Sequence, residues 1–188
     1  NHAQPVSRFQ DYRYVGLFND DAYLLNDAFS EIVEKLNQDE TFAIGGCHIE
    51  HPTGILQPNC APFIGLSYFI RNAIGLDKRH GNLYPDVFED YIEYKKTQEV
   101  DWVTGCCMVL DTKFIRRCGF LDTRFFMFLE DTDLCRRANH SGFKTLYVAS
   151  GKSAHYGALS SKNPDGSFRA DIYVARQKSR LLYLSKYS

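Results

Sequence analysis

Short apolar runs that end abruptly in polar residues predict the strands of an α/β sheet. The first run, Tyr14–Phe18, ends in Asn19-Asp20-Asp21, which is typical of a buried strand that delivers polar groups at its C-terminal edge. Residues 42–47 predict a second buried strand, whose paired glycines allow another backbone or a ligand to approach closely. The other predicted strands span 100–110, 144–148 and the aromatic run 125–129.

Apolar residues at helical spacing predict helices between these strands. Asn26 is expected to cap a helix over 27–36 that covers the sheet, and Asp111 or Thr112 a short helix that Gly119 ends. Further helices are predicted at 131–141, before Gly142, and at 171–187. The proline-rich stretch 48–62 predicts a loop or an irregular edge hairpin, and 75–94 fit no firm element.

Length and composition fit one globular domain spanning 1–188. The chain has 188 residues, of which 44% are hydrophobic and 24% charged. A formal net charge of -1 provides no overall field to attract nucleic acid, which disfavours long duplexes but leaves nucleotide diphosphates as ligands. No apolar run approaches the roughly 20 residues that a bilayer span needs, so we expect a soluble domain.

Six cysteines are scattered along the chain without a CxxC pair or a compact disulfide spacing. This pattern predicts buried, reduced thiols in a cytosolic protein and argues against a structural zinc site. The six are Cys47, Cys60, Cys106, Cys107, Cys118 and Cys135.

An acidic cluster, Glu130-Asp131-Thr132-Asp133, follows the aromatic run where the chain turns into a helix. Acidic residues at a helix start cap its free N–H groups and complement its dipole, so a structural role is one interpretation. A carboxylate presented at the mouth of a site, where it serves catalysis, is the other. Within the cluster, Asp133 fits plain helix capping better than its neighbours.

A second polar group, Asn19-Asp20-Asp21, offers the all-oxygen ligands that hard divalent cations prefer. Asn and Asp also favour polar turns by bonding their own backbone, which is the structural alternative. His155 follows a predicted strand and precedes Gly157, so it is either a ligand at the same sheet edge or a locally bonded histidine.

Four motifs follow one another along the chain: a strand with Asn-Asp-Asp, a strand with Trp102-Val103-Thr104-Gly105, an aromatic run with Glu-Asp-x-Asp, and a strand with His-x-Gly. They are carried by YVGLFNDDAYLLNDAF, by VDWVTGCCMVLDTKFIRRCGFLDTRFFMFLEDTDLCRRANHSGFKTLYVASGKSAHYGALSS and by a final RLLYLSKYS. This order resembles the family 2 glycosyltransferases with a GT-A fold, especially their rhamnosyltransferase-like members. The resemblance implies an α/β fold with a central, mostly parallel mixed sheet flanked by helices.

For the donor side, the resemblance implies that Asn19-Asp20-Asp21 matches the family's DxD-type motif. Asp21 would then contact the metal, while Asn19 and Asp20 would lie near the donor ribose or phosphate. His155 matches a histidine that in many such enzymes contacts the metal or the donor diphosphate.

For the reacting side, the resemblance implies that Glu130 and Asp131 match the family's ED motif, in which the Asp is the usual catalytic base. Glu130 would be the supporting carboxylate. Trp102, Thr104 and Gly105 match the segment that lines the acceptor and the donor sugar. The chemistry agrees, because displacing a nucleoside diphosphate needs a cation on the developing charge and a positioned base for the attacking hydroxyl. The two arginines that follow, Arg136 and Arg137, would pair with phosphate or with the acidic cluster.

Family members usually begin with a strand of the VSIIIPTYN kind and a βα unit that hold the nucleotide, and no such segment precedes Tyr14. We therefore expect this chain to be part of a longer protein, or its nucleotide half to be reduced or supplied elsewhere.

The resulting expectation is an inverting glycosyltransferase that uses Mn²⁺ or Mg²⁺. It would move a hexosyl or rhamnosyl group from a UDP- or dTDP-linked donor to a hydroxyl of a glycan or lipid-linked saccharide, in the cytoplasm or at the inner face of the membrane. Cell-wall or capsule polysaccharide synthesis is the expected context. The main alternative is a noncatalytic carbohydrate-binding or scaffold domain of the same shape. A nucleotide-sugar hydrolase or pyrophosphorylase ranks last, because no Gly-rich phosphate loop is present.

Overall fold

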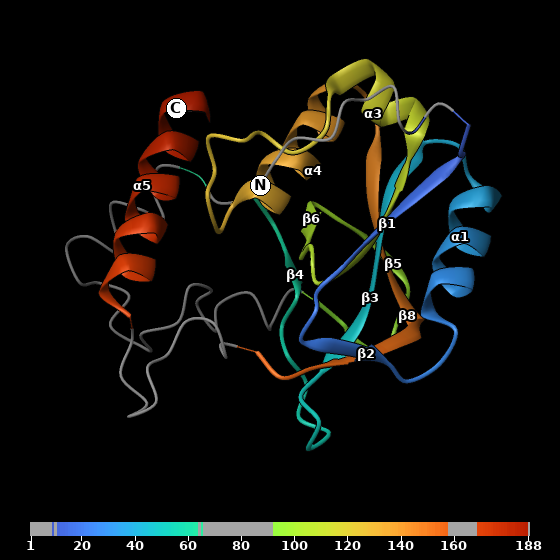
Figure 1. Ribbon diagram of the computed structural model, residues 1–188. Helices are drawn as coiled ribbons and strands as arrows, with labels where there is room; N and C mark the ends of the chain where they lie inside the picture. Colours follow the sequence, from blue (N-terminus) through green and yellow to red (C-terminus); the bar gives the residue numbers. More distant parts are fainter. Residues whose placement is uncertain (1–8, 10, 64, 66–91, 158–168, 188) are drawn as a thin grey trace.

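The computed structural model describes residues 9, 11–63, 65, 92–157 and 169–187 (Figure 1). Within this part, six strands form one sheet in the order β1-β7-β3-β8-β2, with β5 pairing the other half of β8. The strands are β1 (Tyr14–Phe18), β2 (Ala22–Leu24), β3 (Phe42–Glu50), β5 (Gln98–Val100), β7 (Cys107–Asp111) and β8 (Lys144–His155). Two short strands, β4 (Cys60–Ala61) and β6 (Trp102–Val103), pair separately.

The strand directions correct one detail of the predicted α/β fold. In the described residues only β3 and β8 run parallel, whereas the other pairs in this sheet are antiparallel, so the mixed sheet is not mostly parallel. An apolar run that is buried on both faces reads the same in either direction, which is why the sequence pattern did not reveal this.

Helices cover both faces of the sheet (Figure 1). The covering helices are α1 (Ala28–Gln38), α3 (Thr112–Cys118) and α4 (Glu130–His140), whereas α5 (Ala170–Tyr187) stands apart from the sheet, at the left of the view. Apolar side chains of α1, including Ile32 and Leu36, pack against one face, while Phe114 of α3 and Leu134 of α4 pack against the other. The predicted glycine pair lies between these layers: a Cβ on Gly46 would come within 2.7 Å of Val103.

Local capping follows the sequence closely, with one exception. Asp111 caps α3 by accepting the Lys113 N–H at 2.8 Å, and Gly119 ends the helix with φ at 80°, as predicted. Helix α1 is capped by Asp27 rather than by Asn26. The amide of Asn26 instead bonds the backbone of β8, because that strand lies close enough to compete for it.

Several predicted strands differ from those observed. The aromatic run 125–129 is irregular rather than a strand, because Phe128 and Leu129 have positive φ, which an extended strand does not allow. The predicted strand 100–110 is divided among the end of β5, β6 and β7, with breaks at Asp101 and at 104–106. Strand β8 continues through His155 instead of ending before it. The first strand, β1, is only partly buried, since it forms an edge of the described sheet. Most of 75–94 lies outside the described residues.

The six cysteines are all free thiols, and five are buried, in agreement with the sequence. Among the helices that the structure describes, none is both long and apolar enough to cross a membrane.

Candidate active site

The chain enters α4 through an unusual backbone. Phe128 and Leu129 have φ of 68° and 67°, in the left-handed region that side-chain-bearing residues rarely adopt. Leu129 occupies the N-cap position and provides no side-chain cap. Such conformations cost on the order of 1–3 kcal/mol each and persist only where the surroundings impose them. Glu130 and Asp131 are the first two residues after this entry.

Asp131 lies in the first turn of α4 and points at the loop between β6 and β7. Its side chain is held by neutral donors: the Gly105 N–H at 3.0 Å, the Thr132 N–H at 2.7 Å and the Thr132 hydroxyl at 3.3 Å, with a further bond from the Thr104 side chain. The residue is 8% exposed. Burial raises the pKa of Asp131, while these hydrogen bonds act in the opposite direction by favouring the carboxylate.

Glu130, in contrast to Asp131, is not surrounded by hydrogen-bond donors. Its Oε2 is buried and has no hydrogen-bond partner among the described residues. Burial first, and then the charge of Asp131, raises the pKa of Glu130 to about 8. Two adjacent carboxyl groups in a buried site do not both ionise readily, and the donors favour charge on Asp131. The hydrogen-bond donors of the pair are thus directed at Asp131, whereas Oε2 of Glu130 has none among the described residues.

The turn between β1 and β2 brings the second set of predicted residues together. Asp21 Oδ1 lies 3.0 Å from Nε2 of His155, and the Asn19 amide nitrogen lies 3.4 Å from the same imidazole nitrogen. The Asp21 and His155 side chains are 22% and 17% exposed. Asp20 is exposed beside them. Residues 136 positions apart in sequence thus form one polar group.

Gln57 fixes how His155 faces Asp21, and sequence analysis missed it. Gln57 donates through Nε2 to the His155 carbonyl at 2.6 Å, so its Oε1 is left as the acceptor for Nδ1–H of the ring at 3.0 Å. In the neutral ring, Nε2 then directs a lone pair toward the Asp21 carboxylate. Two acceptors 3.0 Å apart need a cation between them, either a proton or a metal ion.

A cation site here would be incomplete without substrate. No group of three or more His, Cys, Asp or Glu side chains in the described residues is arranged to hold a metal ion alone. The donor set nevertheless fits Mg²⁺ or Mn²⁺ in part, because such ions are often held by one or two carboxylates together with substrate phosphates and water. Asp21 and His155 supply one oxygen and one nitrogen.

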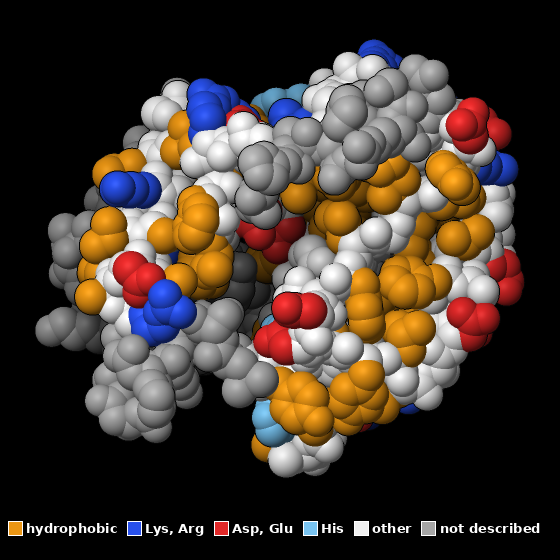
Figure 2. Space-filling model, viewed as in Figure 1, with side chains coloured by type: hydrophobic (Ala, Val, Ile, Leu, Met, Phe, Trp, Pro, Cys, Tyr) orange, Lys and Arg blue, Asp and Glu red, His pale blue; other side chains and the backbone are white. Residues whose placement is uncertain are grey.

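The loop at 104–106 connects the two groups. Gly105 donates its N–H to Asp131, and the next residue, Cys106, accepts the Asn19 N–H through its carbonyl at 3.0 Å. Thr104 N–H in turn bonds the carbonyl of buried Asn59 at 2.8 Å, a residue that carried no sequence signal. The surface is hollowed on this side of the molecule, with acidic side chains in and beside the hollow (Figure 2).

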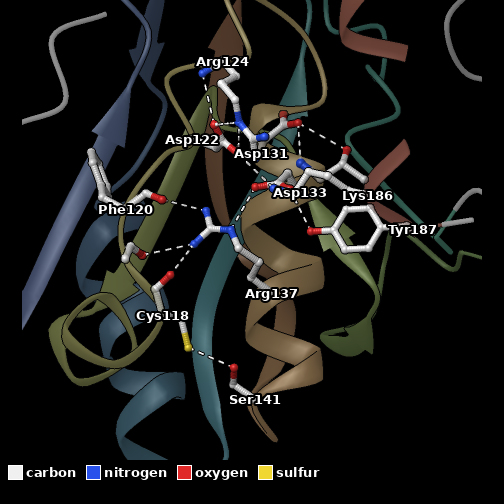
Figure 3. Close-up of polar contacts among 12 residues, drawn as sticks. Cys118, Phe120, Asp122, Arg124, Asp131, Asp133, Arg137, Ser141, Lys186 and Tyr187 are labelled. Carbon is white, nitrogen blue, oxygen red and sulfur yellow. Dashed lines mark hydrogen bonds and ion pairs between the residues drawn. The ribbon is translucent and has the colours of Figure 1, made fainter. Parts of the chain in front are cut away.

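Trp102 and Asp133 occupy different places from those expected. Trp102 is 1% exposed, and its indole N–H donates to the Pro62 carbonyl, so it supports the loop from the core. Asp133 is not a helix cap: its side chain is fully buried and forms an ion pair with Arg137 at 2.9 Å (Figure 3). Arg137 thus pairs with the acidic cluster, whereas Arg136 stacks on aromatic rings.

Comparison with known proteins finds partial relatives. No protein-family model matches the chain. It is 31% identical over 86 residues to the N-acetylglucosaminyl-diphospho-decaprenol L-rhamnosyltransferase of Mycobacterium tuberculosis (strain CDC 1551 / Oshkosh), a match covering 46% of this chain and 27% of that protein. It is 33% identical over 88 residues to the rhamnosyltransferase WbbL of Escherichia coli (strain K12), again covering 46% of this chain and 31% of the relative. The chain therefore matches less than a third of the length of either protein.

The fold also has a solved counterpart. A crystal structure of GalNAc-T7 with UDP, GalNAc and Mn²⁺ superposes with a TM-score of 0.52 over 80% of this chain and 28% of that one, at 10% identity. At this identity the likeness concerns the fold alone. The chain thus has the α/β GT-A fold of glycosyltransferases and is similar, over 46% of its length, to rhamnosyltransferases.

Proposed function

We propose that this chain carries the reacting side of an inverting, metal-dependent glycosyltransferase, which moves a sugar from a nucleotide-sugar donor to a hydroxyl of a glycan. The observation that carries the proposal is the convergence of two polar groups on one loop. Gly105 N–H binds the Asp131 carboxylate, and Cys106 carbonyl binds the Asn19 backbone one residue later. A base and a cation-binding group are what this reaction requires side by side.

Asp131 is the proposed base. It is the carboxyl group of the pair whose hydrogen-bond donors favour the charged form, whereas Oε2 of Glu130 has no partner among the described residues. It would accept the proton of the attacking hydroxyl as the bond to the sugar forms. Glu130 supports this role by keeping a second negative charge out of the buried turn. Thr104 and Gly105 orient the base through their hydrogen bonds to it, and Trp102, two residues before Thr104, is buried in the core.

Asp21 and His155 are the proposed holders of Mn²⁺ or Mg²⁺, with Asn19 and Asp20 toward the donor. The contact between Asp21 and the His155 ring supports this, since the two acceptors share a position for a cation. When bound, the ion neutralises the charge that develops on the leaving diphosphate. The exposure of both side chains leaves room for phosphate oxygens to join them.

The names of the relatives guide the proposed partners. One is a rhamnosyltransferase acting on N-acetylglucosaminyl-diphospho-decaprenol, a lipid-linked saccharide. We extend the proposal to a UDP- or dTDP-linked donor and a glycan or lipid-linked acceptor in polysaccharide synthesis, at the cytoplasmic face of a membrane.

The test pairs donor binding with turnover in the full-length protein. A thermal-shift panel of UDP- and dTDP-sugars with Mn²⁺ should give one donor that raises the melting temperature, and EDTA should abolish that rise. The same donor with a lipid-linked saccharide should yield a glycosylated product and free nucleoside diphosphate. Two results would contradict the proposal. One is donor binding without any glycosylated product, and the other is donor binding with free sugar as the only product. The first result would favour the noncatalytic carbohydrate-binding alternative.

A further inference from the structure

Helix α5 contacts the chain just before the Glu130–Asp131 pair. Ser179 donates its hydroxyl to the Met127 carbonyl at 2.7 Å. Tyr183 packs with Phe125 and Leu129 in a cluster whose three members are 1–2% exposed. These contacts place α5 beside the left-handed entry into α4; in Figure 1 this helix lies to the left of that entry.

The same helix contacts the chain just after the pair. Lys186 Nζ and the Tyr187 hydroxyl both bind Oδ1 of Asp133, the hydroxyl at 2.7 Å. Oδ2 of Asp133 accepts from Arg137 Nε at 2.9 Å, and Lys186 also binds Asp122 at 3.0 Å (Figure 3). Asp133 is completely buried, so its charge depends on these partners.

The first turn of α4 is thus held from two sides. Asp131 faces the loop at Gly105, whereas Asp133, two residues later, faces α5. Without a side-chain cap and with two residues at positive φ, this turn has little of its own to fix it. The residues of α5 supply contacts on both flanks of Glu130 and Asp131, separated from them by about 50 positions in sequence.

We propose that α5 is a clamp that positions Asp131, and that Lys186 and Tyr187 are positioning residues for the transfer reaction. The inference rests on the proposed function in one respect, namely that Asp131 is the base. A displacement of the base on the order of 1 Å is enough to reduce turnover about 100-fold. The clamp holds the base without touching substrate, so losing it should reduce kcat and leave KM in place.

The experiment compares two clamp variants with two controls on the same helix. Lys186→Met removes the cation, and Tyr187→Phe removes only one hydroxyl and keeps the ring. The controls, Lys178→Met and Tyr173→Phe, alter exposed side chains of α5. We expect a kcat at least tenfold lower for Lys186→Met and about threefold lower for Tyr187→Phe, with KM within twofold. Lys186→Arg should restore most of kcat, and the controls should match the parent.

A second readout does not depend on activity. The amide proton of Gly105, which donates to Asp131 at 3.0 Å, reports the position of that carboxylate in an NMR spectrum. It should shift in both clamp variants and not in the controls. If Asp131→Asn left turnover intact, the proposed function would fail, yet a shifted Gly105 signal would still support positioning by α5. If Tyr187→Phe and folded Lys186→Met kept both kcat and the Gly105 signal, while Asp131→Asn was inactive, the clamp would be wrong. Should Lys186→Met not fold, Tyr187→Phe decides.

Discussion

The first turn of α4 and the turn between β1 and β2 both present carboxylates, but they balance negative charge in different ways. Asp131 is 8% exposed and is bound by backbone N–H groups and hydroxyls, and the pKa of Glu130 beside it is raised to about 8, first by burial. Asp21 has a 22% exposed side chain that meets an imidazole. In the first region burial raises the pKa of both carboxyl groups, which favours retention of a proton, whereas in the second the carboxylate lies 3.0 Å from an imidazole nitrogen. Under the proposed function, the first region would serve proton transfer and the second diphosphate binding.

A third carboxylate shows that burial alone does not decide between these two. Asp133 is more buried than Asp131, yet it is matched by Lys186 and Arg137. A buried carboxylate that is fully paired with cations has a structural role, because its negative charge is already compensated by those partners. The catalytic candidate is the neighbour whose donors are neutral, which leaves its basicity available. The predictions below test these contrasts, beginning with the largest expected effect.

Replacing Asp131 by Asn should have the largest effect. The amide keeps the size of the side chain but cannot accept a proton, so kcat should fall by roughly 10²–10⁴. Donor affinity should remain within about threefold of the parent if the proton-transfer region is separate from the diphosphate region. Turnover is measured by release of nucleoside diphosphate. Asp171→Asn, at an exposed position on α5, is the matched control. Wild-type turnover in Asp131→Asn would show that the catalytic base does not lie in this turn.

Replacing Asp21 by Ala should act on binding instead. Loss of one of two protein ligands should weaken Mn²⁺-dependent donor binding about 100-fold, or roughly 2.7 kcal/mol, while donor binding in EDTA stays as in the parent. Isothermal titration of the donor with and without Mn²⁺ measures both. Asp171→Ala serves as the control for loss of a surface carboxylate. Equal metal dependence in Asp21→Ala would break the assignment of the cation to the β1–β2 turn.

Replacing Glu130 by Gln should change how stability depends on pH. The folded-state pKa of about 8 lies above the unfolded value near 4.3, so the folded state holds a proton that the unfolded state releases between those pH values. Stability therefore falls with rising pH in this window. The free energy of unfolding of the parent, relative to Glu130→Gln, should drop by roughly 2 kcal/mol between pH 5 and pH 8, after discounting for partial exposure.

Urea unfolding at pH 5, 6.5 and 8 measures this difference, and groups common to both proteins cancel. Glu34→Gln, on the exposed face of α1, controls for the loss of a surface charge. A parent-minus-variant difference that is flat or rises across the window would mean that Glu130 is ionised in the folded protein. The two carboxylate regions would then not differ in the way argued above.

Features that depend on residues close together in sequence could be predicted, and features that depend on distant residues could not. Asp111 and Gly119 act on their own helix, so α3 was bounded correctly from sequence alone. Asp133 was misinterpreted as a cap because acidic residues in a first turn usually serve that purpose, while two of its three partners lie 53 and 54 positions away. The prediction of a mostly parallel sheet was wrong for a similar reason, because strand pairing depends on contacts between segments that are distant in sequence.

The candidate site shows the same division. Asp21, His155 and Asp131 could be selected because their residue types suit the chemistry and each follows a recognisable pattern. The structure brings Asp21 and His155 into contact. The loop at 104–106 is hydrogen-bonded both to Asp131 and to the backbone of Asn19, two residues before Asp21. Gln57 offered no signal, since it lies in a proline-rich stretch and acts on His155 from 98 positions away. Residues that orient others by long-range hydrogen bonds leave no periodicity to read.

Replacing Gln57 by Leu should produce the smallest effect of the series. The variant loses the bond to Nδ1 of His155 and the bond to its carbonyl, so the ring is free to turn and to place a proton on Nε2, facing Asp21. Supporting hydrogen bonds of this kind typically contribute 10–100-fold to metal affinity. Because phosphate oxygens share the ion, we expect the lower end, about tenfold weaker Mn²⁺-dependent donor binding. Gln38→Leu, exposed on α1, is the control, and an unchanged affinity in Gln57→Leu would mean that the orientation of His155 does not govern the cation.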